Sequence, residues 1–139
     1  MSNGRRTPTL TDTEQAQSHF RSVVDRRHLA TATALVVCCD SQGHPNAHLH
    51  VVDCDVEASP SDCTALLDEL LSRVEGEVGP MVSGLAIGLT RPGGEEVQPY
   101  DRTWFRAFYR VCHQRGLTPY GVYTVTRAGA RPVHIDDAA

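Results

Sequence analysis

Val82 to Val125 reads VSGLAIGLTRPGGEEVQPYDRTWFRAFYRVCHQRGLTPYGVYTV, and this segment decides the fold of the chain. Residues 82–89 are apolar on both faces, which is typical of a strand that is covered on both sides. The loop Arg91-Pro92-Gly93-Gly94 then ends the strand, because Pro and Gly together interrupt regular structure. A helix should begin near Asp101, whose carboxylate can accept hydrogen bonds from exposed backbone N–H groups. Tyr120 to Val125 is rich in aromatic and β-branched residues and predicts a second strand.

The predicted helix carries an apolar stripe. Phe105, Phe108 and Cys112 recur at helical spacing, so they should share one buried face, with Phe108 at its centre against the preceding strand. Arg115-Gly116 should close the helix, since a cation suits the last turn and Gly accepts a positive φ. In an α/β protein, ligands usually bind where a loop leaves the carboxyl end of a central strand. A functional site is therefore expected between Leu89 and Asp101.

Composition limits the classes of function. The chain has 139 residues, of which 40% are hydrophobic, so one globular domain with a real core is expected. Its formal charge of −4 gives no general electrostatic reason to bind nucleic acid. No apolar run approaches membrane-spanning length, and the first ten residues lack the apolar core of a signal peptide. Five cysteines without CxxC spacing predict reduced thiols and a cytoplasmic protein.

Turn residues, helix caps and apolar periodicity divide the rest of the chain. They predict a mixed β-sheet flanked by helices, of the α/β (α+β) class, in a single domain over residues 11–135. The expected order is α-β-β-α-β-α-β-β. The segments predicted outside the opening stretch are a flexible tail at 1–10, a helix at 11–28, a β-hairpin at 34–52, a helix that starts at Ser59 and ends within 76–80, a last strand at 131–135 and a tail at 136–139.

This order of elements, together with two local matches, resembles the JAB/MPN metallopeptidase-like fold and most closely its RadC-type branch. The hairpin turn Asp40-Ser41-Gln42 is similar to the D-S/T-x turn that opens the RadC domain. The loop Arg91-Pro92-Gly93-Gly94, followed by Pro99-Tyr100-Asp101, is similar to the family's H-x-H-P-x-G loop and its S-x-x-D end. The resemblance covers residues 34–135, and it implies the JAB/MPN-like fold.

Carried over to this chain, the family's site is degenerate. Leu89 and Arg91 stand at the two metal-binding His positions, and only Asp101 keeps its residue type. The supporting Ser falls near Gln98 or Pro99, and the catalytic Glu falls near Leu49 or His50. Because Zn²⁺ needs about three protein ligands of N, S or O type, one Asp cannot hold it. The resemblance thus implies a protein without zinc, without another cofactor and without catalytic residues. The residues that mark the degenerate loop are Leu89, Arg91, Pro92, Gly94 and Asp101.

An ion pair can hold this loop without a metal. Arg91 offers a planar fork of donors that matches a carboxylate. We therefore expect its guanidinium to bind Asp101, Glu95 or Glu96. The alternative is a solvated Arg91 whose pairing contributes about 0–1 kcal/mol.

A second possible metal site lies on the hairpin. His48 and His50 are two residues apart on a predicted strand, so both imidazoles share a face. His44 or Cys54 could complete a ligand set. The alternative is that these histidines are solvated or hydrogen-bonded, since the family places its motif after the buried strand instead.

Three classes of function follow. The first is a catalytically inactive interaction module, a pseudoenzyme that binds a protein partner or itself as a homo-oligomer. The second is a metal-dependent hydrolase that uses His48 and His50. The third is a nucleic-acid-associated accessory domain, suggested by analogy with RadC and by scattered arginines. We rank the first highest because the expected site has lost its ligands.

Overall fold

The computed structural model describes residues 8–78 and 82–134, and it confirms the predicted mixed sheet and the order α-β-β-α-β-α-β-β. Among these residues no helix is both long enough and apolar enough to cross a bilayer. The elements are α1 (Thr13–Val23), the 3₁₀ turn η1 (Arg26–His28), β1 (Thr33–Cys39), β2 (Pro45–Val51), α2 (Pro60–Val78), β3 (Gly84–Thr90), α3 (Pro99–Arg115), β4 (Thr118–Thr126) and β5 (Gly129–Val133).

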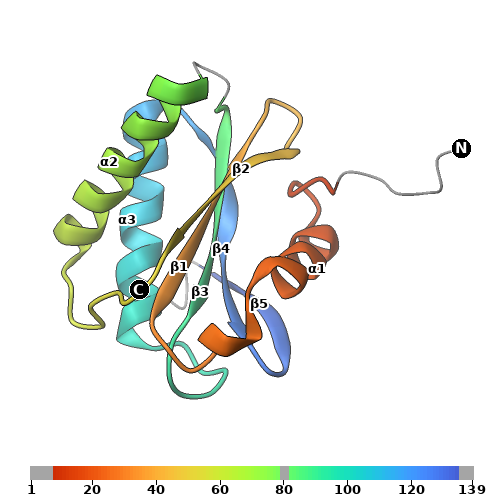
Figure 1. Ribbon diagram of the computed structural model, residues 1–139, viewed down its shortest axis with the longest axis vertical. Coiled ribbons are helices and arrows are strands. Elements are labelled where there is room, and N and C mark those ends of the chain that lie inside the picture. The colour runs from red at the N-terminus through yellow and green to blue at the C-terminus, as the bar shows by residue number, and fades with distance from the viewer. Residues whose placement is uncertain (1–7, 79–81, 135–139) are drawn as a thin grey trace, which may run out of the picture.

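The five strands form one sheet in the order β2-β1-β3-β4-β5. β3 and β4 are parallel and are joined through α3, whereas the other neighbours are antiparallel. Helices α2 and α3 pack on one face of the sheet and α1 packs on the other (Figure 1). Because helices cover both faces, β1 and β3 are buried at every position. This burial explains why residues 82–89 are apolar on both faces.

The larger core lies between the sheet and the pair α2 and α3. Phe108 is fully buried at its centre, as its place in the apolar stripe predicts, and Trp104 is buried beside it. At the far end of α3, Arg115 joins the two helices. Its guanidinium donates to Asp68 at 2.8 Å and to Glu75 at 2.9 Å, both on α2.

The smaller core lies between the sheet and α1. Phe20 of α1 is fully buried there, and its ring lies over Gly88 of β3. A Cβ atom at position 88 would come within 2.5 Å of that ring, so β3 needs glycine at this position. Cys38 and Cys39 point into the two different cores, as expected for adjacent strand residues.

The N-terminal predictions need correction. Residues 8–10 are not a flexible tail, because Leu10 is buried in the smaller core and its N–H donates to the Gly43 carbonyl. The helix expected over 11–28 is divided, since Val24 is extended and Asp25 caps the separate turn η1. Asp12 caps α1, because its side chain accepts a hydrogen bond from the Glu14 N–H.

Several other boundaries differ by a few residues. α3 begins at Pro99 instead of Asp101, because Pro is well suited to the first helical position. α2, in contrast, ends at Val78, inside the range 76–80 predicted for its end. β5 begins at Gly129, because Thr126 pairs with Gly129 across a two-residue turn. Residues 1–7, 79–81 and 135–139, which include the tail predicted at 136–139 and the end of the strand predicted at 131–135, lie outside the described residues.

We predict that Phe108→Ala lowers the free energy of unfolding by about 3–5 kcal/mol, because a buried ring is lost and a cavity remains. Arg110→Ala, an exposed change on the same helix, should shift it by only about 0.5 kcal/mol. Urea denaturation of both variants measures the difference. Equal stability of the two variants would show that the core is not built around this ring.

Candidate functional site

The loop after β3 is closed by a buried ion pair. Arg91 Nε and Nη2 each donate to one carboxylate oxygen of Asp101, both at 2.9 Å. The side chains of Arg91 and Asp101 are 1% and 0% exposed. Arg91 also donates to the backbone carbonyls of Gly94 and Glu96, each at 2.8 Å. The expected pairing of Arg91 with a loop carboxylate is confirmed for Asp101, while Glu96 contributes its backbone.

The carboxylate of Asp101 also caps the N-terminus of α3. Asp101 accepts from the backbone N–H of Gln98 at 2.9 Å and so forms half of a capping box. The Gln98 amide in turn donates to the Pro92 carbonyl at 3.1 Å. Gly93 lies between these groups at φ +106, a conformation that side chains rarely adopt, and a Cβ there would clash with Gln98. The loop is therefore packed around Arg91.

Leu89 and Arg91 lie at the end of β3, next to the first turn of α3, which carries Asp101. Leu89 points into the larger core beside Tyr100 and Trp104, on the same side of β3 as Arg91. These side chains do not fit Zn²⁺, since Leu89 has no donor atom and Arg91 brings a cation to the carboxylate of Asp101. No step of metal-dependent hydrolysis can be derived through this site.

The hairpin histidines lie on the opposite face of the sheet. His48 and His50 point toward α1 and η1, whereas Leu49 packs on the larger core. Leu49 therefore lies on the same face of the sheet as Arg91, and His50 points away from it. A site that used His48 and His50 could not include the degenerate loop.

Each hairpin histidine has a different neighbour. The Nε2 atoms of His48 and His19 are 2.9 Å apart, which is a hydrogen bond between two imidazoles. The ring of His50 stands edge to face with that of His28, and His44 lies 3.6 Å from a carboxylate oxygen of Asp40. The three histidines of the possible ligand set are thus not gathered. No group of three or more His, Cys, Asp or Glu placed to hold a metal occurs among the described residues.

The His19–His48 pair favours neutral imidazoles. Partial burial lowers the pKa of His19 below its ordinary value of 6.5, and the neighbouring His48 lowers it further. Burial also lowers the pKa of His48. One neutral ring must donate and the other accept, so protonation of both would replace the hydrogen bond with repulsion.

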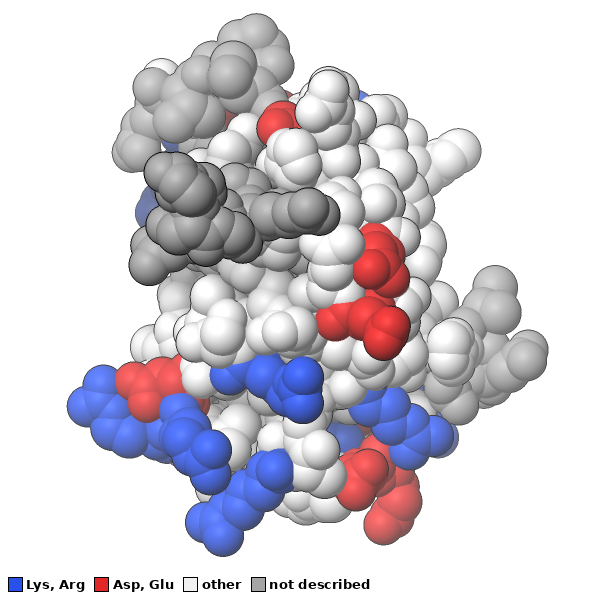
Figure 2. All heavy atoms as spheres, turned by 90° about the vertical axis from the view of Figure 1, so that its right-hand side faces the viewer, with Lys and Arg blue, Asp and Glu red and all other residues white. Residues whose placement is uncertain are grey.

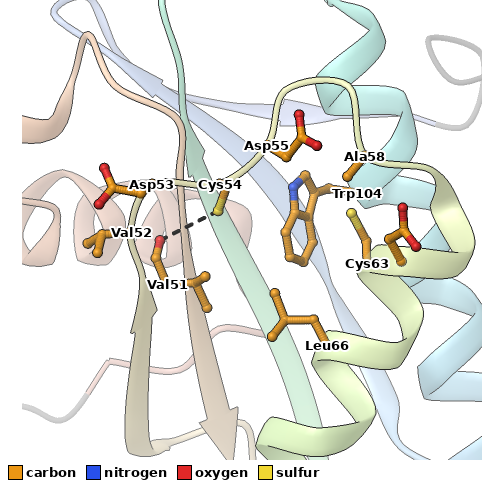
Figure 3. A pocket seen from close by; sticks show the side chains of 10 residues that line it. Val51, Val52, Asp53, Cys54, Asp55, Ala58, Cys63, Leu66 and Trp104 are labelled. Carbon is orange, nitrogen blue, oxygen red and sulfur yellow. Dashed lines mark hydrogen bonds between the residues drawn. The ribbon is translucent and has the colours of Figure 1, made fainter.

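Residues 52–58 lie between two hollows, of which one is beside the degenerate loop and the other is beside α2. One, of about 400 Å³, is lined by Val56 and by the loop residues Arg91, Pro92 and Gln98. The other, of about 190 Å³, lies between the end of β2, α2 and α3 (Figure 3). The segment contributes two of the most exposed apolar side chains of the described residues, Val52 and Val56.

Trp104 gives the smaller hollow a distinctive polar atom. Its indole Nε1 is buried and has no hydrogen-bond partner among the described residues. The Tyr100 hydroxyl lies near the indole: burial raises the pKa of this hydroxyl, and Trp104 partly offsets the rise. The hydroxyl donates to the Thr33 carbonyl at 3.0 Å, and its geometry toward Nε1 is not that of a hydrogen bond. The sequence places Trp104 on a buried helix face, yet it does not reveal a missing partner.

The thiols in this hollow are not activated. Burial raises the pKa of Cys54, and it raises the pKa of Cys63 to about 11. Both thiols are therefore protonated near pH 7, whereas a nucleophilic cysteine needs a lowered pKa. All five cysteines of the chain are free. The hollow is suited to binding and not to thiol chemistry.

Arginines gather at the end of the molecule near the degenerate loop. In Figure 2 several basic side chains surround the lower end of the view. A hollow of about 580 Å³ there is lined by Arg26, Arg27 and Arg127 together with Gly93, Gly94 and the acidic Glu95. Arg27 is paired with Asp25 at 2.7 Å, whereas Arg26 and Arg127 form no ion pair with a described residue. This local basic end is not visible in the net charge of −4.

We predict that Arg91→Met lowers the free energy of unfolding by about 3–5 kcal/mol, because Asp101 is left as an unpaired buried charge. If Arg91 were an exposed tether, its replacement would loosen only the loop and would lower the free energy of unfolding by much less. The double variant Arg91→Met with Asp101→Asn should regain much of it, since Asn keeps an acceptor for Gln98 N–H without a charge. Urea denaturation of these two variants and of Asp101→Asn gives the free energies of unfolding for a double-mutant cycle. Additive losses would mean that the pair is not coupled.

We also predict that stability falls as the pH drops below about 6.5. The pKa values of His19 and His48 are lowered in the folded state, so the unfolded chain takes up protons first. The contribution of the neutral His19 and His48 side chains to the free energy of unfolding is fully present above pH 6.5. It is lost as the pH falls through the pKa values of these histidines in the folded state. Urea midpoints at pH 7.5 and 5.5 measure this loss. His19→Gln with His48→Gln should reduce it, while His134→Gln, on an exposed residue beyond β5, should not.

No model of a known protein family matches the chain, and no curated protein matches its sequence. The resemblance to the RadC-type branch continues to rest on the loop residues and on the order of the elements.

Proposed function

We propose that this protein is a non-catalytic, cytoplasmic interaction module with a RadC-like arrangement, in which an internal ion pair replaces the metal of the family's site. The observation that carries the proposal is the nearly complete engagement of the Arg91 guanidinium. Four of its five donor hydrogens bind Asp101 and two loop carbonyls. A group so fully bonded and buried is a structural tie and is not free to act on a substrate.

The surface beside this loop supports binding. Val52 and Val56 are 48% and 50% exposed, and they lie on the segment that separates the two hollows. Exposed apolar side chains next to preformed hollows are typical of interaction sites, where a partner covers them. The partner is another protein or a second copy of the chain.

Zinc binding tests the non-catalytic part of the proposal. The purified protein is expected to contain much less than one zinc per chain, and added zinc should not raise its melting temperature. Leu89→His with Arg91→His supplies two further ligands beside Asp101, and only this variant should bind zinc and be stabilised by it. About one zinc per wild-type chain, lost on changing His48 and His50 to Ala, would instead favour the hydrolase.

Photo-crosslinking tests the interaction part. A benzophenone side chain at position 56 should form covalent adducts in cells of the source organism, whereas the same group at the exposed position 23 on α1 should not. Sedimentation velocity of the purified chain then separates self-association from a different partner. Equal labelling from both positions would show that the segment 52–58 is not an interaction site.

A nucleic-acid-associated domain is the second candidate, and the arginine end favours it. Arg26 and Arg127 border a glycine-lined hollow at the carboxyl ends of the parallel strands β3 and β4, where α/β proteins usually bind ligands. Arginine without an acidic partner is suited to phosphate. A local basic surface can act in this way even though the net charge of the chain is negative.

Salt dependence of DNA binding tests this candidate. If phosphates bind at the arginine end, Arg26→Ala with Arg127→Ala should weaken retention on duplex DNA and lower the slope of log K against log salt by about 2. Arg73→Ala with Arg110→Ala removes the same charge elsewhere and should change neither quantity by as much. A wild-type protein that elutes without salt dependence would exclude the candidate.

A further inference from the structure

We propose that the hollow around Trp104 is an anchor site for an apolar side chain of a basic peptide segment. This inference rests on the proposed function and specifies the partner and its place of binding. The hollow is lined by the end of β2, the segment 52–58, Cys63 and Leu66 of α2 and Trp104 of α3. Figure 3 shows these side chains arranged around the indole, with its nitrogen turned toward Cys54 and Asp55.

The unpartnered indole points to a missing acceptor. Trp104 is 1% exposed, and its N–H has no hydrogen-bond partner among the described residues. A buried donor without a partner is unfavourable, and the large majority of buried polar groups in proteins do have a hydrogen-bond partner. A peptide carbonyl entering the hollow would supply the acceptor. The atom therefore indicates a ligand that carries both apolar surface and a hydrogen-bond acceptor.

The size of the hollow favours a side chain over a whole small molecule. Its volume of about 190 Å³ is below the roughly 300–1,000 Å³ of typical small-molecule sites. Apolar surface continues outside it through Val52, which is 48% exposed. β2 is an edge strand that ends at this hollow, so an extended chain could also bind along its free edge. These features fit a segment of polypeptide.

The acidic residues at the rim of the hollow indicate the charge of the peptide that would bind there. Asp53, Asp55 and Asp62 line the hollow and are exposed, and no Lys or Arg lines it. Asp53 holds the left-handed conformation at φ 54, which turns the chain from β2 into the segment 52–58. Carboxylates around an apolar hollow are complementary to Lys or Arg on either side of the anchor. The inferred ligand is thus an apolar residue between basic residues.

Trp104 is the only tryptophan of the chain, so it reports on this site directly. The experiment titrates the full-length ¹⁵N-labelled protein with capped heptapeptides that carry Leu, Phe or Gly at the centre and Lys or Glu on both sides. The Lys peptides with Leu or Phe should shift the single indole N–H resonance in a saturable manner. Peptides with Gly at the centre or Glu at the sides should bind at least tenfold more weakly.

Three variants and one control variant sharpen the result. Trp104→Phe removes the donor and should weaken binding about three- to tenfold, followed by the backbone amide shifts of Cys54 and Leu66. Ala58→Phe should fill the mouth of the hollow and abolish binding. Asp53→Asn with Asp55→Asn should erase the preference for Lys over Glu. Val23→Asp alters an equally exposed apolar residue on the other face and should leave binding unchanged.

Other outcomes would overturn the inference. Failure of every peptide to shift the indole resonance at millimolar concentration would show that the hollow takes no peptide anchor. Equal shifts by the Lys and Glu peptides would refute the role of the acidic rim. A concentration-dependent dimer that Ala58→Phe dissociates would make a second copy the occupant instead. Because zinc content and crosslinking from position 56 are measured independently, the proposed function can stand when this inference fails.

Discussion

The structure depends on one buried ion pair, between Arg91, directly after the central strand, and Asp101, in the first turn of the helix that follows. Two charges in an apolar core are costly to desolvate, and the cost is offset only when their hydrogen bonds are satisfied. Here Arg91 binds both oxygens of Asp101 and two loop carbonyls, while Asp101 also accepts from Gln98 N–H. The pair therefore sets the direction in which α3 leaves β3, and with it the parallel placement of β4.

The sheet separates the polar chemistry of the protein into two faces. Arg91, Asp101 and Trp104 lie on the side covered by α2 and α3, whereas His48 and His50 face α1 and η1. Strand alternation makes this separation unavoidable, because His48 and His50 share a face that Leu49 does not. A metal site assembled from the histidines and the degenerate loop is thus excluded by backbone geometry. The histidines serve instead to join α1 to the edge of the sheet through the contact between His19 and His48.

Local patterns predicted the fold, and long-range contacts limited what could be predicted of the site. The apolar run of β3, the hairpin and the stripe around Phe108 follow from residues close together in sequence, and the structure confirms them. The pairing of Arg91 with Asp101 could be expected because ten residues separate them in one loop-helix unit. The pairing of His19 with His48 could not, since it depends on how α1 crosses the sheet. The burial of Leu10 was missed for the same reason.

The unpartnered indole of Trp104 distinguishes a binding surface from a merely exposed one. Val52 and Val56 alone would be ordinary, because many apolar side chains remain exposed on folded proteins. A buried N–H without an acceptor is different, since it costs about 1–3 kcal/mol in the free protein. A ligand that supplies the acceptor removes this cost and gains the new hydrogen bond as well. Affinity at such a site can therefore exceed what its small volume suggests, because the energy of the unbound state contributes to it.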